Sequence, residues 1–194
     1  MPAPKVDGRT VRYQHRRPEL LAAASEYVLQ HGIAGLSLRP AARALGVTHA
    51  TLLRHFSTKD ELLAEVVEHV RARFVAQLAA DEARHADADT AELVRAAWQR
   101  LCEPAEQRQF LLLFQLVGPA DPAAAVAPDV ARALAEDWRR PIERRLVRDG
   151  HDPDDAVALS TAVVATVRGL QLDLVLSGDR ERADRALETV LRTL

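Results

Sequence analysis

The chain has 194 residues, and its 26 basic and 28 acidic side chains give a formal net charge of −2 at pH 7. Almost half of the residues are hydrophobic, few are aromatic, and Ala, Leu and Arg are abundant, which favours an all-α protein. No apolar segment follows a basic N-terminus, and the longest uncharged stretches, 110–120 and 156–167, are shorter than the ~20 residues of a membrane-spanning helix, so we expect a cytoplasmic protein with no membrane partner.

The charge is unevenly distributed along the chain. Residues 1–57 hold eight basic and three acidic side chains, a net of +5, so the remaining 137 residues carry −7. Phosphate groups attract the first part and repel the second. The distribution therefore predicts that a nucleic-acid-binding surface lies in the N-terminal part.

The first helix is predicted after a flexible basic arm formed by residues 1–16, which are polar and contain Pro and Gly. Pro18 suits the first turn of a helix, where its missing N–H costs little. We expect this helix to reach about Gln30 and to end at Gly32. Its apolar face carries Leu20, Leu21, Ala24 and Val28.

Two short helices are predicted between residues 37 and 56. Ser37 can cap the first helix, whose inward face carries Ala41, Ala42 and Leu45. Gly46 supplies the left-handed residue that a tight turn needs, and Thr48 can cap the second helix, 49–56. Two helices joined by a short turn with a Gly form a helix-turn-helix, whose second helix enters the major groove of DNA.

Six longer helices are expected in the rest of the chain. Ser57 with Asp60 is a capping signal for a helix from about residue 58 to 85, and Asp89 with Glu92 is a capping box for the next. The helix from Asp89 is expected to end before Pro104 and another at Gly178, and Pro141 is expected to kink the helix that contains it. The predicted ranges are 58–85, 89–101, 104–117, 128–148, 152–178 and 180–194, which gives nine helices in total.

The helix expected between residues 154 and 176 is apolar on nearly all sides. In a soluble protein such a helix must be covered on both sides. A second copy of the chain would cover it by forming a four-helix bundle with the last helix across a two-fold axis; the alternative is the central helix of a monomer. The predicted homodimer interface consists of Val157, Val164, Leu172, Val175, Leu187, Val190 and Leu191.

Residues 37–63 resemble the DNA-binding domain of the tetracycline repressor (TetR) family of bacterial regulators. The resemblance depends on the following groups, whose spacing matches without a gap: Ser37-Leu38-Arg39, Ala42, Gly46-Val47-Thr48, Thr51-Leu52, Arg54-His55-Phe56 and Lys59-Asp60-Glu61-Leu62. The chain departs from the family at Leu53, where an aromatic residue, most often Tyr, commonly donates to a phosphate. It also has Ala41 where the family often has a β-branched apolar residue.

The resemblance implies three segments: the arm 1–16, a DNA-binding domain at 17–63, and a ligand-binding and dimerisation domain at 64–194. It implies a homodimer on double-stranded DNA, acting as a repressor that an unknown small-molecule effector releases from a palindromic operator. Helix-turn-helix proteins read bases with the start of the second helix and use other residues on phosphates. The predicted DNA-contacting residues are Arg12, Arg16, Arg17, Ser37, Arg39, Thr48, His49, Ala50, Thr51, Arg54, His55 and Lys59. Any one of them alone is equally compatible with a solvated surface side chain.

The resemblance also implies a ligand pocket inside the body of the protein. Bulky or polar residues on otherwise apolar faces are typical of such pockets, and ordinary core packing is the alternative for the aromatic ones. The predicted pocket residues are Trp98, Cys102, Phe110, Phe114, Gln115, Trp138, Arg168 and Gln171.

Two other classes of protein are weighed against a regulator. An enzyme is disfavoured because the chain has no Gly-rich phosphate loop, no His-Glu-x-x-His motif and no Cys pair. Its seven His residues are scattered, so we expect no metal site and no cofactor, and the lone Cys102 fits an inert thiol in a reducing compartment. A helical interaction module that has lost DNA binding is the other alternative, which the absent Tyr makes conceivable.

Overall fold

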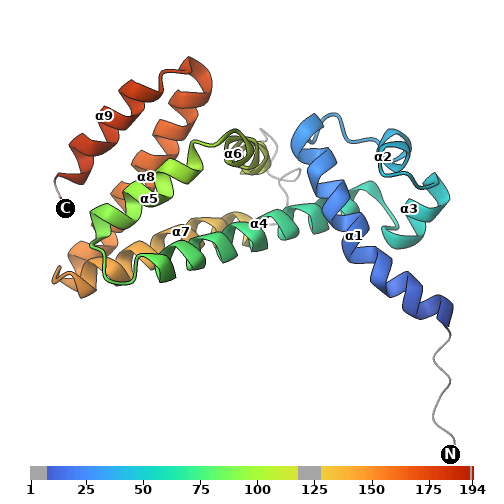
Figure 1. Ribbon diagram of the computed structural model, residues 1–194, viewed down its shortest axis with the longest axis horizontal. Coiled ribbons are helices and arrows are strands. Elements are labelled where there is room, and N and C mark those ends of the chain that lie inside the picture. The colour runs from blue at the N-terminus through green and yellow to red at the C-terminus, as the bar shows by residue number, and fades with distance from the viewer. Residues whose placement is uncertain (1–7, 118–127, 193) are drawn as a thin grey trace, which may run out of the picture. The chain divides into compact units, whose positions relative to one another are not determined.

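The structure is a computed structural model that describes residues 8–117 and 128–194, except residue 193. In this part of the chain there are nine α-helices and no strand (Figure 1), as predicted. The helices divide into two compact units, 1–72 and 73–194. The division falls within α4 (Lys59–Arg84), which begins in the N-terminal unit and ends in the C-terminal one, rather than at the predicted boundary after residue 63.

The N-terminal unit contains α1 (Gly8–His31), α2 (Leu38–Ala44), α3 (His49–His55) and the start of α4. Gly46 lies between α2 and α3 with a φ of +68°, a left-handed conformation that Gly adopts without steric cost. The N–H of Val47 then donates to the carbonyl of Ala42 at 2.9 Å and closes the turn. The predicted helix-turn-helix is therefore present.

Apolar side chains from all four helices of the N-terminal unit are buried. They recur at helical spacing, so each helix turns one face inward. The buried set includes Leu20, Ala24, Val28, Leu36, Ala41, Ala42, Leu52, Phe56, Leu62 and Leu63.

The expected flexible arm is wrong for residues 8–16, which form the first turns of α1, with Pro18 inside the helix. Proline removes one backbone donor, but residues 9–17 contain no other helix breaker and include Arg, Gln and Tyr, which tolerate a helix. A polar and basic composition therefore does not by itself prevent a helix here. Residues 1–7 lie outside the described residues.

The C-terminal unit contains the end of α4 together with α5 (Thr90–Leu101), α6 (Pro104–Val117), α7 (Pro128–Arg148), α8 (Pro153–Ser177) and α9 (Arg180–Leu191). Asp89 and Glu92 form the predicted capping box of α5. Gly178 ends α8 with a φ of +70° and donates to the carbonyl of Leu174 at 2.8 Å. This turn brings α9 back against α8 (Figure 1).

The core of the C-terminal unit is built around α8, whose inward stripe contains Val163, Val167 and Leu174. Trp98 from α5 and Leu187 from α9 pack into the same cluster. By length and composition α8 could also cross a membrane, with a mean hydropathy of 1.4 in its most apolar window. The core helix of a soluble protein has the same properties, and α8 packs against α7 and α9 here.

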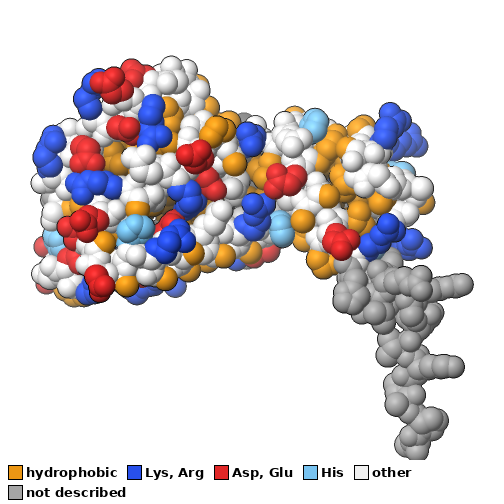
Figure 2. All heavy atoms as spheres, viewed as in Figure 1, with side chains coloured by type: hydrophobic (Ala, Val, Ile, Leu, Met, Phe, Trp, Pro, Cys, Tyr) orange, Lys and Arg blue, Asp and Glu red, His pale blue; other side chains and the backbone are white. Residues whose placement is uncertain are grey.

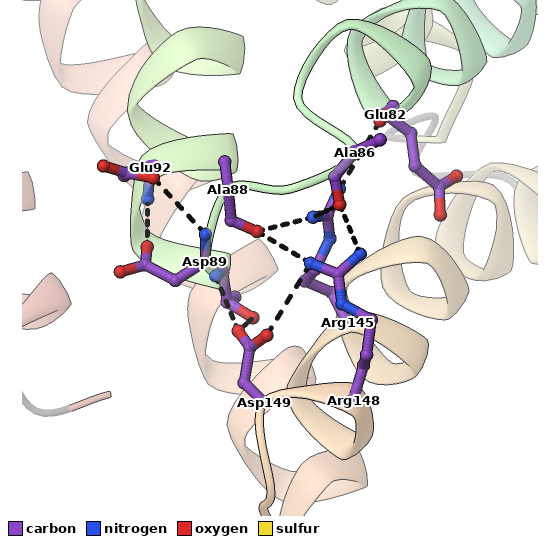
Figure 3. A network of polar contacts seen from close by, with 9 residues as sticks. Glu82, Ala86, Ala88, Asp89, Glu92, Arg145, Arg148 and Asp149 are labelled. Carbon is purple, nitrogen blue, oxygen red and sulfur yellow. Dashed lines mark hydrogen bonds and ion pairs between the residues drawn. The ribbon is translucent and has the colours of Figure 1, made fainter.

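A polar network fastens the loop between α4 and α5 to the end of α7 (Figure 3). The buried guanidinium of Arg145 donates to the carbonyls of Ala86 and Ala88 at 3.0 and 2.6 Å. Asp149 accepts from both the N–H and the hydroxyl of Thr90 at 2.7 Å. Arg145 also donates to the carbonyl of Glu82 in the last turn of α4 at 3.5 Å, where a helix carbonyl lacks a partner within the helix. Its guanidinium therefore holds both the end of α4 and the loop that follows.

Candidate nucleic-acid interface and internal cavity

The N-terminus of α3 is fixed by its own first turn. The hydroxyl of Thr48 accepts from the N–H of Thr51 at 3.0 Å, and the two Thr hydroxyls are 2.9 Å apart. This is the predicted N-cap, which orders the first residues of a helix. The residues that follow Thr48 therefore have a defined direction on the surface of the unit.

Polar and basic side chains surround this helix end on the outside of the N-terminal unit. Arg39 is exposed on α2, as are Ala50 and Arg54 on α3, while His49 and Thr51 are half-buried. Figure 2 shows Lys and Arg side chains gathered on the side of the unit that α2 and α3 form. Such a surface offers hydrogen-bonding groups on a rigid helix within a positive field, which suits the major groove of DNA.

The N-terminus of α4 adds a second group of donors. Thr58 caps this helix, accepting from the N–H of Glu61 at 3.0 Å, while Glu61 accepts from the N–H of Ser57 at 3.0 Å. The cap therefore lies one residue later than the predicted pair, Ser57 and Asp60. Lys59 is exposed in the first turn, where the free N–H groups of a helix attract a phosphate.

Two predicted DNA-contacting residues are placed elsewhere by the structure. Arg17 lies beside Glu65, with its Nη2 2.5 Å from the carboxylate, and its guanidinium lies over the ring of Phe56, so it ties α1 to α4. His55 is only 6% exposed and is part of the interior. Burial lowers the pKa of His55 below its usual value, and the charges of Arg54, Arg17 and Arg16 lower it further.

The remaining predicted contacts keep a surface position where they are described. Arg16 and Ser37 are exposed, and Ser37 has the extended backbone of an N-cap, with no capping hydrogen bond from its side chain. Arg12 lies in α1. Leu53, which stands where the related family usually has Tyr, is half-buried.

The C-terminal unit contains a pocket of about 320 Å³, within the size range of small-molecule sites. Five of the eight predicted pocket residues line it: Phe110, Phe114, Trp138, Arg168 and Gln171. The sequence analysis missed the other lining residues, which are Phe74, Leu101, Glu106, Gln109, Leu113 and Ala135.

The walls of the pocket are largely aromatic. Phe74 of α4 stacks on Trp138 of α7 with ring centroids 4.6 Å apart, and Phe110 and Phe114 of α6 are 5.9 Å apart. The guanidinium of Arg168 lies over the Trp138 ring at 5.7 Å. Burial lowers the pKa of Arg168 below its usual value, yet an arginine retains its charge at neutral pH.

Two amide side chains of the wall are deeply buried. Gln171 is 1% exposed, and neither its Nε2 nor its Oε1 has a hydrogen-bond partner among the described residues. The Oε1 of Gln109 is likewise buried without a partner in this part of the chain. Buried amides are nearly always hydrogen-bonded in proteins, so these atoms are a marked exception.

Three predicted pocket residues lie outside the cavity. Trp98 is a core residue, and its Nε1 donates to Asp184 at 2.6 Å. Cys102 is buried in the same core, and burial raises the pKa of its thiol to about 12. Gln115 is exposed on the opposite side of α6 from Gln109. The periodicity of the sequence identifies bulky residues on apolar faces. It does not show which of them already pack against, or hydrogen-bond to, residues that are distant in the sequence.

The missed Gln109 and Glu106 had a detectable signal. They lie at helical spacing with Phe110 and Leu113, so α6 turns two polar residues inward on one apolar face. Glu106 accepts from Arg100 at 3.0 Å, and Arg100 also donates to Asp81 at 2.9 Å. Arg84 also pairs with Asp81, so two guanidinium groups balance the two carboxylates.

The predicted dimer residues fall into two groups. Val164, Leu187 and Leu191 are buried within the single chain and are therefore not available to a second copy. Val164 lies among residues of α5 and α7, whereas the two Leu residues are buried because α9 packs on its own α8. Val157 is 43% exposed, and Leu172, Val175 and Val190 are half-buried. Leu176, 78% exposed, was not predicted.

No group of three or more His, Cys, Asp or Glu side chains that could hold a metal ion occurs in residues 8–117 or the described part of 128–194.

Comparisons with known proteins find a family model that matches part of the N-terminal unit and relatives that match nearly the whole chain. The family model for bacterial regulatory proteins of the tetR family matches residues 20–66. The HTH-type transcriptional regulator CymR of Pseudomonas putida is 26% identical, over 97% of this chain and 94% of CymR. Among solved structures, NalD of Pseudomonas aeruginosa, the secondary repressor of the MexAB-OprM multidrug efflux pump, is 25% identical with a TM-score of 0.61, covering 92% of this chain and 95% of NalD. The multidrug-binding protein EbrR, solved with proflavin, is 26% identical with a TM-score of 0.62, covering 92% of this chain and 99% of EbrR.

Proposed function

Because this chain belongs to the TetR family of bacterial transcriptional regulators, we propose that it is a homodimeric repressor that a small molecule releases from a palindromic operator. One observation carries the proposal: α4 begins with Lys59 on the basic surface and continues to Phe74 in the pocket wall. A single helix thus joins the two sites. NalD is a repressor and EbrR binds a small molecule, which supports the same division of roles.

On the DNA side, we propose that α3 reads base edges in the major groove. His49, Ala50 and Thr51 lie in its first turn and Arg54 lies one turn later, the arrangement by which a recognition helix contacts bases. Thr48 would face the groove with them, and Ser37, Arg39 and Lys59 would contact phosphates and fix the register. Arg12 and Arg16 would follow the adjacent minor groove or backbone. Arg17 is already paired with Glu65 and His55 is buried, so we leave both out of the proposed contacts.

The coupling between the sites follows from the length of α4. Phe74 follows Lys59 by fifteen residues within the same helix. A ligand that displaces the Phe74–Trp138 pair would move α4 as a rod, since the core around it is closely packed. Moving Lys59 changes the distance between the two recognition helices of a dimer, and a fixed operator then fits less well.

TetR-family membership implies a dimer, and we propose that its interface is formed by the outer surfaces of α8 and α9. Val157, Leu172, Val175 and Val190 give these helices an apolar surface that a second copy would cover. Val157→Glu is expected to convert the dimer to a monomer in sedimentation. Val147→Glu is the matched control because Val147 is also 43% exposed but lies on α7.

The relatives are transcriptional regulators, and we propose that this chain likewise has no enzymatic activity, needs no cofactor and acts in the cytoplasm, where its DNA target is located. The alternative, an interaction module of the same fold, is raised by Leu53 in place of the usual phosphate-binding Tyr.

Selection of bound duplexes from a random pool by the full-length protein tests the proposal. We expect an inverted repeat to be enriched, with an affinity that falls steeply as salt concentration rises. Arg39→Gln should weaken binding to this duplex, whereas Arg108→Gln, the same change at an exposed site of the C-terminal unit, should not. No enrichment at low salt would favour the interaction module.

A further inference from the structure

Three polar atoms of residues that line the pocket are buried and have no hydrogen-bond partner among the described residues. Gln171 presents one amide NH₂ and one carbonyl oxygen, and Gln109 presents a second carbonyl oxygen, all buried without partners among the described residues. Leaving such groups unpaired inside a protein costs free energy. A molecule that fills the pocket lowers this cost if it offers an acceptor for the Gln171 NH₂ and a donor for each of the two carbonyl oxygens.

The shape and surface of the pocket restrict the rest of that molecule. The stacked pair Phe74–Trp138 and the pair Phe110–Phe114 provide ring surfaces. The remaining lining combines three aliphatic residues with four polar or charged ones: Leu101, Leu113, Ala135, Glu106, Gln109, Arg168 and Gln171. Aromatic rings prefer to pack against other rings in stacked or tilted arrangements. A flat aromatic body therefore fits this volume.

The charges in the wall argue against a cationic ligand. Arg168 contributes a guanidinium beside Trp138, and the carboxylate of Glu106 already accepts from Arg100. A cation would meet positive charge without gaining an acidic partner. A carboxylate would gain attraction from Arg168 but would bring no donor for the two amide oxygens.

We propose that the pocket binds an uncharged aromatic molecule that carries a primary carboxamide, or an equivalent group with one carbonyl oxygen and two N–H donors. Its carbonyl accepts from Nε2 of Gln171, and its two N–H groups donate to the Oε1 atoms of Gln171 and Gln109. The inference rests on the proposed function only for the role of this molecule as the effector.

Three isosteric probes and their parent hydrocarbon separate the contributions of the ring, the hydrogen-bonding groups and the charge to the binding affinity. They are 2-naphthamide, 2-naphthoate, 2-naphthamidine and naphthalene. Calorimetric titration of the full-length protein without DNA is expected to show that naphthamide binds at least tenfold more tightly than the acid or the amidine. Only the amide supplies both donors and an acceptor without charge. Equal or tighter binding of naphthoate or naphthamidine would overturn the inference.

A pair of variants tests the role of Gln171. Gln171→Leu should weaken naphthamide binding at least tenfold and leave naphthalene binding within twofold, which also shows that the variant is folded. Gln77→Leu is the matched control: its Oε1 is also buried without a partner in the described chain, but it does not line the pocket. Unchanged naphthamide affinity in Gln171→Leu contradicts the proposed pairing.

A parallel measurement of operator affinity keeps this inference separate from the proposed function. If naphthamide binds with the expected pattern but operator affinity is unchanged, the ligand chemistry stands and the release mechanism fails. If the protein binds an inverted repeat but naphthamide does not bind, the ligand chemistry fails and the DNA-binding role stands.

Discussion

The proposed DNA-contacting surface of the N-terminal unit and the pocket of the C-terminal unit differ in where their polar groups lie. In the N-terminal unit, the buried hydroxyl of Ser25 donates to the carbonyl of Leu21 at 2.8 Å, and the proposed recognition residues lie on the surface. In the C-terminal unit, Gln171 and Gln109 remain unpartnered inside the described structure. The side chains proposed to contact DNA lie on the surface of a packed core. The proposed small-molecule site lies inside a core in which two amide side chains have no hydrogen-bond partner among the described residues.

The largest expected effect comes from removing a ring from the packed core of the N-terminal unit. Phe56 is fully buried, so Phe56→Ala should destabilise the N-terminal unit by about 3–5 kcal/mol and abolish DNA binding. Urea unfolding followed by circular dichroism measures the loss. Phe114→Ala, at the half-exposed edge of the pocket, should change stability by less than about 1 kcal/mol. Equal losses in the two variants would remove the contrast between the units.

The network at the end of α4 gives the next largest effect. Arg145 is 3% exposed and donates to two loop carbonyls, so Arg145→Met should cost about 2 kcal/mol of the free energy of unfolding. Arg148 donates to the same carbonyls from an exposed position, and Arg148→Met should cost less than about 1 kcal/mol. A larger loss for Arg148→Met in denaturant titration would refute the importance of burial here.

Substitutions on the DNA-binding surface should separate base reading from phosphate contact. Thr51→Val or His49→Ala should reduce discrimination between operator and mismatched duplex by about 1–3 kcal/mol. Lys59→Gln should weaken binding to all duplexes alike and make the slope of log affinity against log salt smaller by about 0.9. Fluorescence anisotropy at several salt concentrations measures both. Uniform losses from all three variants would contradict the division between the two kinds of contact.

The smallest expected effect is a pH dependence from His55. Its pKa is lowered from 6.5 by burial and by nearby arginines, so the unfolded state takes up a proton at a higher pH than the folded state. Stability is then fully present above pH 6.5 and decreases as the pH falls below it. Thermal unfolding between pH 7.5 and 5 should show this decrease, and His55→Gln should reduce it. His49→Gln, at a half-buried site on the same helix, is the control and should leave it unchanged.

Much of the fold was predictable because helix ends depend on residues close in sequence. The capping box of Asp89 and Glu92 and the left-handed Gly178 lie at the predicted ends. The burial of His55 was missed, although it lies three residues after the core residue Leu52, because α3 is only seven residues long. In such a short helix the inward and outward faces are poorly separated by periodicity.

The pocket was only partly predictable because long-range pairing decides which polar or bulky residues are available. Trp98 was expected in the pocket, but its Nε1 bonds Asp184, 86 residues away. Leu187 and Leu191 were expected at a dimer interface, but α9 packs on its own α8 and buries them. The amphipathic pattern of a helix shows that one face is covered, without showing which partner covers it.

The composition of one protein–DNA complex tests the central claim most directly. Sedimentation of the full-length protein on its selected duplex, combined with hydroxyl-radical footprinting, gives the number of protomers and the positions that they protect. We predict protomers in pairs on an inverted repeat, with protected half-sites about one duplex turn, roughly 34–36 Å, apart. A single protomer on the duplex, or protection without two-fold symmetry, would contradict the account.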